Sequence, residues 1–462
     1  MTRTVYAHFI GIGGAGVSGL ARVLHDRGYV VTGSDLRASR YATALQDAGV
    51  HVSIGHAEEN LGNPEVVVVS SAIPEWNPEL VAARNRGIPI WPRAKMLAHL
   101  SGDDATLAVA GTHGKTTTSS MLARALDGMG LDPTFLIGGE LNDVGSNARC
   151  GDGGYYVVEA DESDGSFLYL RPHLSILTNM EADHLDHYGT FEEIVRTFGE
   201  FIERTDPSGV IVACADDERL VGLVRDRSPC RVVTYGRSDA ADVRCHSLVP
   251  AGLGHRFLVD FPDGSSAAFT IQVPGEHNVV NATAVLCAVW ALGYEPERAA
   301  GGLAGFEGVR RRFDRLGEVD GVLVVDDYAH HPTEVRATIA GARAAGFERI
   351  FVVFQPHRYS RTQALGDEFG AAFDSADRVV VMDVYGAGET PVPGVSGKTV
   401  LDALLRHQPR AEAAYFPHRG DIGGYIAERV RPGDLVMTMG AGDVTTVGPE
   451  LMGAMAERSG QR

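Results

Sequence analysis

Short apolar runs alternate with amphipathic stretches along the first hundred residues. They predict a strand at 5–11, a helix at 17–27, a strand at 29–33 and a buried strand at 65–70. Strands that alternate with helices are typical of a parallel sheet covered by helices on both faces. The segment 89–102, which contains Pro and Gly and runs into Ser-Gly-Asp-Asp at 101–104, marks a domain boundary, so we place the first domain at 1–100.

The same alternation continues through two further blocks. Predicted elements of the second block are strands at 106–110, 155–158, 174–177 and 209–213 and helices at 116–129 and 279–292. Residues 231–272 predict short antiparallel strands joined by Gly turns. Predicted strands of the third block lie at 321–325, 349–354, 378–382 and 434–439. We therefore expect an α/β protein with a second domain at 101–309 and a third at 310–462.

The composition of the chain excludes several classes of function. The chain has 462 residues, which suits three domains of roughly 150 residues each. Its net charge of −19 repels nucleic-acid backbones and anionic membrane surfaces, so neither is an expected partner. The five cysteines include no C-x-x-C pair, the start lacks the features of a signal peptide, and no apolar stretch is long enough to span a membrane. These features predict a cytoplasmic protein.

A first glycine loop, residues 11–16, has the pattern G-x-G-x-x-G directly after a strand and before a helix. Asp35 ends the next predicted strand, at the spacing that a nucleotide-binding unit requires. The amino end of the helix can therefore receive a diphosphate. The ligand would be a dinucleotide or a nucleotide sugar, since the motif does not distinguish NAD from UDP. The alternative is a tight turn that needs glycine for packing alone.

A second glycine loop, residues 111–117, lies between another predicted strand and helix. Its sequence Gly-Thr-His-Gly-Lys-Thr-Thr departs from the Walker pattern, because Val109 stands where the first Gly is expected. The chemistry survives the shorter loop. Main-chain N–H groups can curl around phosphate oxygens, Lys115 can reach the β and γ phosphates, and the Thr116 hydroxyl can bind Mg²⁺. We therefore predict a P-loop-type ATP-binding domain between two Rossmann-like domains.

Two acidic segments follow neighbouring strands of the second block, at 159–164 and 179–186. Glu159 and His184 lie closest to the strand ends, where a carboxylate and a neutral imidazole suit a hydrated Mg²⁺ beside a triphosphate. Zinc fits poorly, because no third soft ligand stands at a suitable spacing. For three other acidic residues a solvated loop is an equally good interpretation: Asp161, Glu162 and Asp164.

Polar residues follow four consecutive strands of the third block, at the edge where open parallel sheets bind their ligands. They occupy 326–327, 355–361, 383–388 and 440–443. Arginine is suited to carboxylate and phosphate recognition, and Arg358 and Arg361 would lie near one another on a helix. Of the three arginines at 310–312 we assign a functional role to Arg311 alone, the alternative being a solvated linker.

Taken together, these motifs resemble those of the Mur ligases, the enzymes that build the peptidoglycan stem peptide. The likeness covers essentially the whole chain. Besides the loop at 111–117, the residues that carry it are Glu159, His184, Asn278, Asn281, Arg311, Asp326 and His330. The stretches 11–19, 159–164, 327–334 and 355–362 are similar to the family member that adds L-alanine, although Val17 stands where that member ordinarily has Met.

The resemblance implies a role for each domain. The first would bind UDP-N-acetylmuramate through Gly13, Gly14, Ala15, Gly16, Asp35, Ser70 and Ser71. The second would bind ATP through Gly111, Thr112, His113, Gly114, Lys115, Thr116, Thr117 and Asn278, joined by Arg311 and Asp326. Two Mg²⁺ ions would be held by Thr116, Glu159 and His184. The third domain would bring L-alanine through Tyr328, His330, His357, Arg358 and Arg361. A monomer or weak homodimer is expected.

The implied reaction proceeds through an acyl phosphate, formed when the lactyl carboxylate attacks the γ-phosphate and consumed when the amine of L-alanine attacks it. The implied catalytic residues are Lys115, Glu159, His184, Asn278, Arg311, Asp326 and His330. Several family members carry a carbamylated lysine after the second acidic segment. This chain has no lysine between Lys115 and Lys398, so a carboxylate, an imidazole or water must support the second metal ion.

Three alternatives remain open. A sibling ligase, either the murein-tripeptide recycling enzyme or a folylpolyglutamate synthase, would share the ATP loop but take another substrate. An NAD-dependent oxidoreductase would use the first glycine loop but has no need of the second. A non-catalytic UDP-sugar sensor would be expected to lose the acidic and histidine positions, which this chain keeps.

Overall fold

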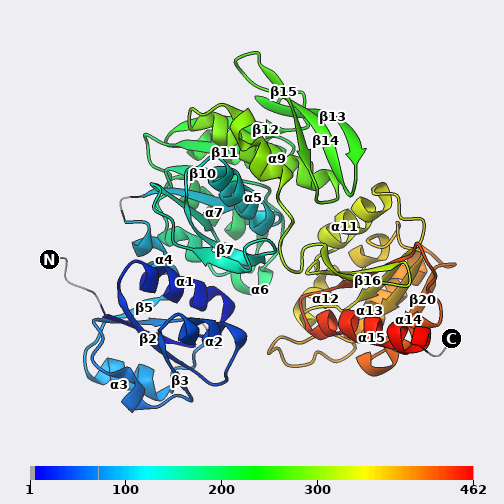
Figure 1. Cartoon of the computed structure of the whole chain (residues 1–462), viewed down its shortest axis with the longest axis horizontal. Coiled ribbons are helices and arrows are strands. Elements are labelled where there is room, and N and C mark those ends of the chain that lie inside the picture. The colour runs from blue at the N-terminus through cyan, green and yellow to red at the C-terminus, as the bar shows by residue number, and fades with distance from the viewer. Residues whose placement is uncertain (1–5, 71, 103, 461–462) are drawn as a thin grey trace. The chain divides into compact units, whose positions relative to one another are not determined.

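The computed structural model describes residues 6–70, 72–102 and 104–460 of the chain. Two compact units are present. The first comprises 1–245, 259–267 and 281–303, and the second comprises 246–258, 268–280 and 304–462. Helices and strands alternate along most of the chain, so the predicted α/β class is confirmed (Figure 1). No helix among the described residues is long and apolar enough to cross a membrane.

The first sheet is wholly parallel, with β1 at its centre. Its strands, in spatial order, are β3 (His51–Ile54), β2 (Val30–Asp35), β1 (Tyr6–Ile10), β4 (Val66–Val69) and β5 (Ile90–Pro92). Its helices are α1 (Ala15–Asp26), α2 (Arg40–Asp47), α3 (Pro78–Asn85) and α4 (Arg93–Leu100). Because the strand order reverses at β1, the loop that follows β1 lies where such sheets bind ligands.

The second sheet has ten strands, and β6 carries the second glycine loop. In spatial order they are β15 (Ser266–Ile271), β14 (Gly254–Asp260), β13 (Val243–Ala251), β12 (Arg231–Gly236), β11 (Val210–Cys214), β10 (Leu174–Leu177), β6 (Ala105–Ala110), β9 (Tyr155–Glu159), β7 (Thr134–Leu141) and β8 (Ser146–Arg149). The helices of this region are α5 (Lys115–Gly128), α6 (Leu185–Tyr188), α7 (Phe191–Ile202), α8 (Glu218–Arg227), α9 (Glu276–Ala291) and α10 (Ala300–Ala304). The prediction of antiparallel strands throughout 231–272 was wrong for β12, which runs parallel to β11 and β13. Side-chain alternation marks a strand but not the direction of its neighbours.

The third sheet has six strands and a core on each face. In spatial order they are β16 (Asp314–Val319), β17 (Val322–Asp327), β21 (Leu435–Met439), β18 (Ile350–Phe354), β19 (Arg378–Val381) and β20 (Glu412–Tyr415). The helices are α11 (Pro332–Ala344), α12 (Tyr359–Leu365), α13 (Gly397–His407), α14 (Ile422–Ala427) and α15 (Val447–Gly460). Leu323 and Val325 enter one buried apolar cluster and Val322 and Val324 the other, as the twofold repeat of a strand requires.

The third sheet differs from the prediction in two strands that were not predicted, β16 and β20, and in the place of two aspartates. The sequence pattern did not predict β16, because its residues Asp-Arg-Leu-Gly-Glu-Val include three charged residues and a glycine. It pairs antiparallel with β17, and the register shifts between Arg315 and Gly317. Asp326 and Asp327 were expected in a loop but form the end of β17, where they are 1% and 4% exposed. Carboxylates buried in this way need hydrogen-bond donors, which the fold must bring to them.

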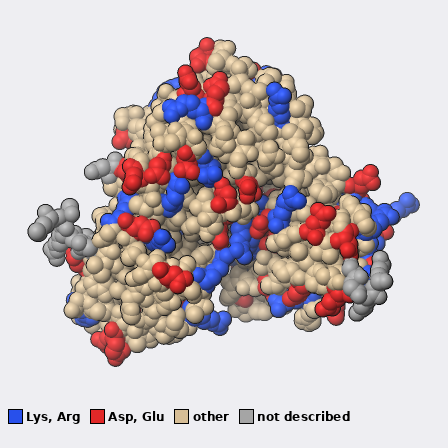
Figure 2. All heavy atoms as spheres, in the orientation of Figure 1, with Lys and Arg blue, Asp and Glu red and all other residues tan. Residues whose placement is uncertain are grey.

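Charged side chains are mixed on the surface. Figure 2 shows Asp and Glu side chains interspersed with Lys and Arg side chains on the visible face. Ion pairs such as Arg22 with Asp26 and Arg149 with Asp127 join groups of opposite sign. A phosphate ligand would therefore be held by local groups rather than by a broad positive field.

Candidate active site

The end of β2 holds the first glycine loop. The Gly11 N–H donates to the Ser34 carbonyl at 2.8 Å. The Gly13 N–H donates to Asp35 Oδ2 at 2.9 Å, and the Ser39 hydroxyl donates to the Gly13 carbonyl at 2.8 Å. Asp35, which was predicted to contact the nucleotide sugar, therefore also fixes the shape of the loop.

The rest of the predicted UDP-sugar site lies around the amino end of α1. Gly14 precedes this helix, and Gly16 lies in its first turn. Gly16 leaves room for Arg93 of α4, since a Cβ on Gly16 would lie 2.8 Å from Arg93 Nη1. Arg93 was not predicted, and its guanidinium adds a cation to the positive end of the helix. Ser70 follows β4 and is half-buried, whereas the predicted Ser71 lies outside the described residues.

A buried carboxylate is connected to this loop through Ser34. Glu79 of α3 has no solvent exposure and accepts hydrogen bonds from the Ser34 hydroxyl, from Asn60 Nδ2 at 2.9 Å and from the Ala57 N–H at 3.1 Å. His8 Nε2 lies 3.2 Å away. Burial by itself would raise the pKa of Glu79, but these hydrogen bonds lower it to about 2. No sequence motif marks Glu79, because its partners come from separate segments.

The residues that follow β10 hold the second glycine loop. Gly111 has a φ of +136°, and a Cβ on it would lie 2.0 Å from the Thr178 hydroxyl oxygen, so only Gly fits. The His113 N–H donates to Asn179 Oδ1 at 2.8 Å, and the His113 carbonyl accepts the Thr178 hydroxyl at 2.6 Å. Gly114, left-handed at φ +82°, then precedes α5. The free N–H groups of the first turn of α5 therefore adjoin the loop, as an anion site requires.

Lys115 begins α5 and folds back over the loop. Its Nζ donates to the Gly111 carbonyl at 2.7 Å, to the Thr112 carbonyl at 3.1 Å and to Glu162 Oε1 at 2.7 Å. Burial opposes the charge on Lys115, but Glu162 and neighbouring carboxylates outweigh it and raise the lysine pKa. Burial raises the pKa of Glu162, whereas the charge of Lys115 lowers it and stabilises the ionised carboxylate. The ammonium group therefore stays charged at neutral pH.

The three predicted metal ligands come from separate segments of the first unit. The Thr116 hydroxyl, in the first turn of α5 beside Thr117, donates to Glu159 Oε1 at 3.1 Å. His184 precedes α6 with a φ of +54°, which is uncommon for a residue other than glycine. Its Nε2 lies 3.8 Å from Glu162 Oε1.

The oxygens of Thr116 and Glu159 fit a magnesium ion. A hydroxyl and a carboxylate side by side are the hard donors that Mg²⁺ prefers, with water completing its coordination shell. Glu159, Glu162 and His184 do not form a close cluster of three ligand atoms in the described part of the chain. The role of His184 as a metal ligand therefore stays a prediction.

The two predicted asparagines of α9 belong to different units. Asn281 lies near the phosphate loop, since a Cβ on Gly114 would be 3.0 Å from Asn281 Oδ1. Asn278 is 8% exposed, and its Nδ2 donates to the Pro274 carbonyl at 2.7 Å. Its contact with ATP stays a prediction.

In the second unit, Arg311 and Asp326 form an ion pair. Arg311 Nε donates to Asp326 Oδ2 at 3.0 Å, and Arg311 has a left-handed φ of +61°. The hydroxyls of Thr438 and Thr445 donate to Asp326 at 2.6 and 2.7 Å. The sequence singled out Arg311 and Asp326, but nothing marked the threonines, which lie 112 and 119 residues after Asp326.

Aromatic rings gather near the carboxyl ends of β17 and β18. The rings of Tyr328 and His330 lie 5.2 Å apart, and those of His330 and His357 lie 5.7 Å apart. Arg361 Nη1 lies 3.3 Å from His357 Nδ1. Burial, together with His330, Arg361 and Arg358, lowers the pKa of His357 to about 3, so its ring is neutral at neutral pH. The structure thus brings four predicted amino-acid-binding residues together.

The sequence spacing suggested that Arg358 and Arg361 lie near one another on a helix, but they do not share a helix face. Arg358 has a φ of +69° and precedes α12, whereas Arg361 lies inside that helix and is 9% exposed. Arg358 Nη1 lies 3.9 Å from Glu389 Oε1, which accepts the Ser360 hydroxyl at 2.6 Å. Glu389, from the loop that follows β19, was missed because no local pattern distinguishes it from other acidic loop residues.

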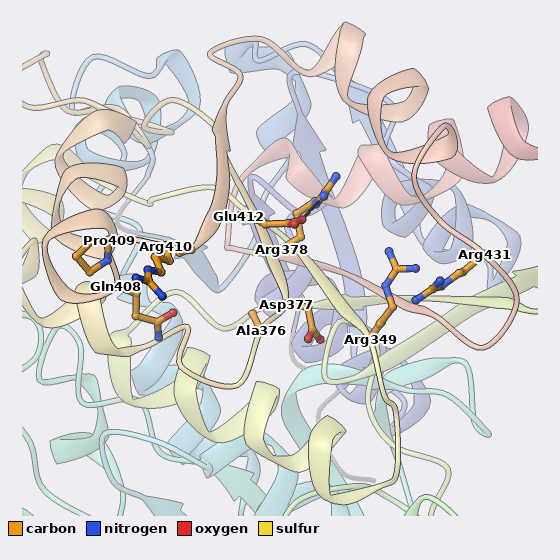
Figure 3. Close-up of a pocket in the computed structure, with 10 residues that line it drawn as sticks. Arg349, Ala376, Asp377, Arg378, Gln408, Pro409, Arg410, Glu412 and Arg431 are labelled. Atoms are coloured by element: carbon orange, nitrogen blue, oxygen red, sulfur yellow. Dashed lines mark hydrogen bonds and ion pairs between the residues drawn. The ribbon is translucent and has the colours of Figure 1, made fainter.

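A separate groove of about 950 Å³ lies at the amino ends of β18, β19 and β20 (Figure 3). Its lining includes Arg349, Arg378 and Glu412. Arg378 Nε donates to Glu412 Oε2 at 2.8 Å, and Arg349 Nη1 lies 3.4 Å from Asp434 Oδ2. These ion pairs occupy the opposite end of the strands from the predicted site residues, so the groove is not part of that site.

Three family descriptions match successive parts of the chain. They are "Mur ligase family, catalytic domain" at 6–104, "Mur ligase middle domain" at 109–289 and "Mur ligase, glutamate ligase domain" at 311–442. The chain is 50% identical to the UDP-N-acetylmuramate–L-alanine ligase of Kineococcus radiotolerans, over 98% of this chain and 96% of that protein. It is 49% identical to the ligase of the same name from Rubrobacter xylanophilus, over 96% of this chain and 99% of that protein.

Solved structures show the same likeness. The UDP-N-acetylmuramate-alanine ligase of Thermotoga maritima aligns with a TM-score of 0.81 at 29% identity, over 99% of both chains. A murein peptide ligase of Psychrobacter arcticus aligns with a TM-score of 0.72 at 26% identity, over 98% of both chains. The likeness therefore includes all three sheets.

Proposed function

The chain belongs to the Mur ligase family, and from that premise we propose how its loops and side chains divide the work. The reaction is the ATP-dependent joining of L-alanine to the lactyl carboxylate of UDP-N-acetylmuramate, with release of ADP and phosphate, in peptidoglycan precursor synthesis. The nearly full-length similarity to L-alanine ligases carries this conclusion. The lysine-bearing phosphate loop supplies its ATP site.

The UDP sugar would bind to a first domain at 1–100. Main-chain N–H groups at the amino end of α1 would donate to the diphosphate, and Arg93 would add a positive charge. Asp35 would hold the loop in the receiving shape through Gly13. Ser70 follows β4, the strand beside β1, and would line the same crevice, whereas Ser71 stays a predicted contact.

ATP would bind to a second domain at 101–309. Lys115 and the N–H groups of the first turn of α5 would stabilise charge on the phosphates. Magnesium, held by Thr116, Glu159 and His184, would neutralise further phosphate charge when bound. The lactyl carboxylate oxygen attacks the γ-phosphorus, the bond from that phosphorus to the β–γ bridging oxygen breaks, and ADP leaves. Asn278, Arg311 and Asp326 would complete this site.

L-Alanine would bind to a third domain at 310–462. Arg358 and Arg361 can pair with its carboxylate. His357 is neutral and its Nδ1 accepts from Arg361, so its Nε2 carries the proton and can donate to that carboxylate. His330 Nδ1 donates to the Tyr328 carbonyl, so in the neutral ring Nε2 is the nitrogen that can accept a hydrogen bond from the amino group. The amine attacks the acyl carbon and loses a proton, and phosphate leaves with the electrons of the broken C–O bond. Orienting the amine in this way raises its effective concentration at the acyl carbon.

No carbamylated lysine takes part in this scheme, because the chain has no lysine between Lys115 and Lys398. We propose that Glu159, His184 or water fills that position. Carboxylate and water oxygens are common magnesium ligands, so the site does not require a carbamate.

Phosphate release tests the proposal. With ATP, Mg²⁺ and UDP-N-acetylmuramate present, each amino acid is added in turn, and L-alanine should be needed for steady release. Omission of the UDP sugar, or removal of Mg²⁺ with EDTA, should stop it, and excess Mg²⁺ should restore it. Release with a murein tripeptide but not with L-alanine would assign the chain to the recycling branch. No release with any acceptor would contradict the ligase activity itself.

A further inference from the structure

All three N–H donors of the Lys115 ammonium group are in use. Two acceptors are the Gly111 and Thr112 carbonyls, which belong to the phosphate loop, and the third is Glu162 Oε1 at 2.7 Å. Phosphate oxygens in the loop would compete with the two neutral carbonyls for the lysine. All three bonds have a charged donor, but only Glu162 can add the opposite charge, which makes its contact with Lys115 a salt bridge. It is therefore the contact most able to persist when nucleotide binds.

Glu162 is fixed in place from its main chain outward. Its carbonyl accepts the Tyr188 hydroxyl and the Gly165 N–H, the latter at 3.0 Å. The residue is only 2% exposed, and its Oε2 has no hydrogen-bond partner among the described residues. A buried carboxylate oxygen without a donor costs free energy, so Glu162 does not stabilise the fold through this oxygen.

We propose that Glu162 is a positioning residue for Lys115. It holds the ammonium group beside the loop while the phosphates of ATP replace the Gly111 and Thr112 carbonyls. By restricting the rotamers of Lys115, it presents the charge to the γ-phosphate in one orientation, which lowers the entropic part of the barrier. The role rests on the proposed ligase reaction and concerns a residue to which the family resemblance assigned no function.

A purely structural ion pair would behave differently. Replacing such a pair changes the stability of the fold, and often by little when the replacement fills the same volume. It would leave the orientation of a folded lysine side chain, and the turnover number, largely unchanged. A positioning residue instead affects turnover in a protein whose thermal unfolding is close to that of the wild type.

The kinetic test compares Glu162→Gln with Asp164→Asn, a neighbour whose side chain is exposed. Glu162→Gln keeps the shape of the side chain and removes its charge. We expect kcat to fall about 10- to 100-fold, in line with the loss of a charge-assisted hydrogen bond, while KM for ATP changes less than about threefold. Glu162→Asp should recover part of the loss, and Asp164→Asn should behave as the wild type. Unchanged kcat in Glu162→Gln would overturn the proposal.

A second test does not depend on turnover, because the chain has only three lysines, Lys95, Lys115 and Lys398. In protein labelled with ¹³C at lysine Cε, NMR should give three side-chain signals, and Lys115→Arg identifies one of them. We expect an ordered Lys115 signal in the wild type, with and without a non-hydrolysable ATP analogue and Mg²⁺. In Glu162→Gln it should become as mobile as Lys398.

An ordered Lys115 signal in Glu162→Gln would also overturn the proposal, whether or not the protein is an active ligase. The two failures give different results. If the ligase reaction is wrong, the wild-type protein releases no phosphate, but its Lys115 signal is still ordered and still loses that order in Glu162→Gln.

Discussion

The two glycine loops both join a parallel strand to a helix, yet they prepare for anions differently. The first loop, at 11–16, contains no cation, and its nearby guanidinium comes from Arg93 on another helix. The second, at 111–117, carries Lys115, which Glu162 holds within the same unit. A diphosphate that is only bound needs N–H donors and a helix end. A phosphate that is transferred develops charge, so it also needs a fixed cation and metal ligands.

The carboxylates near the two loops also have different contacts. Asp35 accepts the Gly13 N–H, and Glu79 accepts the hydroxyl of Ser34, whose carbonyl holds the loop start, so both act on the backbone of the first loop. Glu159 and Glu162 instead contact side chains that are predicted to meet ATP and Mg²⁺. Carboxylates thus shape one loop and set the charge of the other.

Lys115→Ala should produce the largest difference between the two loops, because it should impair the use of ATP and leave UDP-sugar binding nearly unchanged. We expect kcat/KM for ATP to fall at least ~10³-fold, or about 4 kcal/mol, because the cation that neutralises the transferred phosphate is lost. Affinity for UDP-N-acetylmuramate, measured by calorimetry without ATP, should change less than about twofold. Lys398→Ala, at an exposed position, is the matched control. Equal losses for both ligands would show that the loops do not act separately.

Acid should destabilise the first sheet through Glu79. Its folded pKa of about 2 lies below the ordinary value of 4.5, so its contribution to stability is present above pH 4.5 and is lost as pH falls toward 2. The full contribution is on the order of 3 kcal/mol. In Glu79→Gln, thermal unfolding of this region should depend less on pH across that range.

The control for this prediction is Glu75→Gln. Glu75 pairs with Arg84 at the surface, where its side chain is 79% exposed, and such pairs contribute little. If both variants lose the same pH dependence, the hydrogen bonds to Glu79 do not stabilise the fold as described.

Gly13→Ala should affect the first loop alone, and by the smallest amount. A Cβ there would lie 2.7 Å from Ser39 Oγ and 3.0 Å from Asp35 Oδ2, so both anchors must shift. We expect KM for the UDP sugar to rise about tenfold, which corresponds to about 1.4 kcal/mol, with KM for ATP unchanged. Gly222→Ala, in α8 with nothing within 4 Å of the added carbon, should leave both constants unchanged. A rise in KM for ATP would contradict the independence of the loops.

Much of the fold and the centre of each loop could be predicted from contiguous residues. A buried strand, a glycine turn and an amphipathic helix are encoded within about 20 residues, so β1 with α1 and β6 with α5 were located to within two or three residues. The resemblance of the motifs to those of the Mur ligases also predicted the family. The strand β16 was missed, and the direction of β12 was predicted wrongly. Strand pairing is a relation between two segments and not a property of either one.

The sequence by itself determined the α/β class, the order of the two glycine loops and the presence of Lys115 after the second. Only the tertiary structure decided which groups hold these parts. It brought Glu162 to Lys115, Arg93 to the first loop, and Thr438 and Thr445 to Asp326. A hydrogen bond requires two groups within about 3 Å, and residues distant in sequence reach that separation only through the packing of the whole sheet.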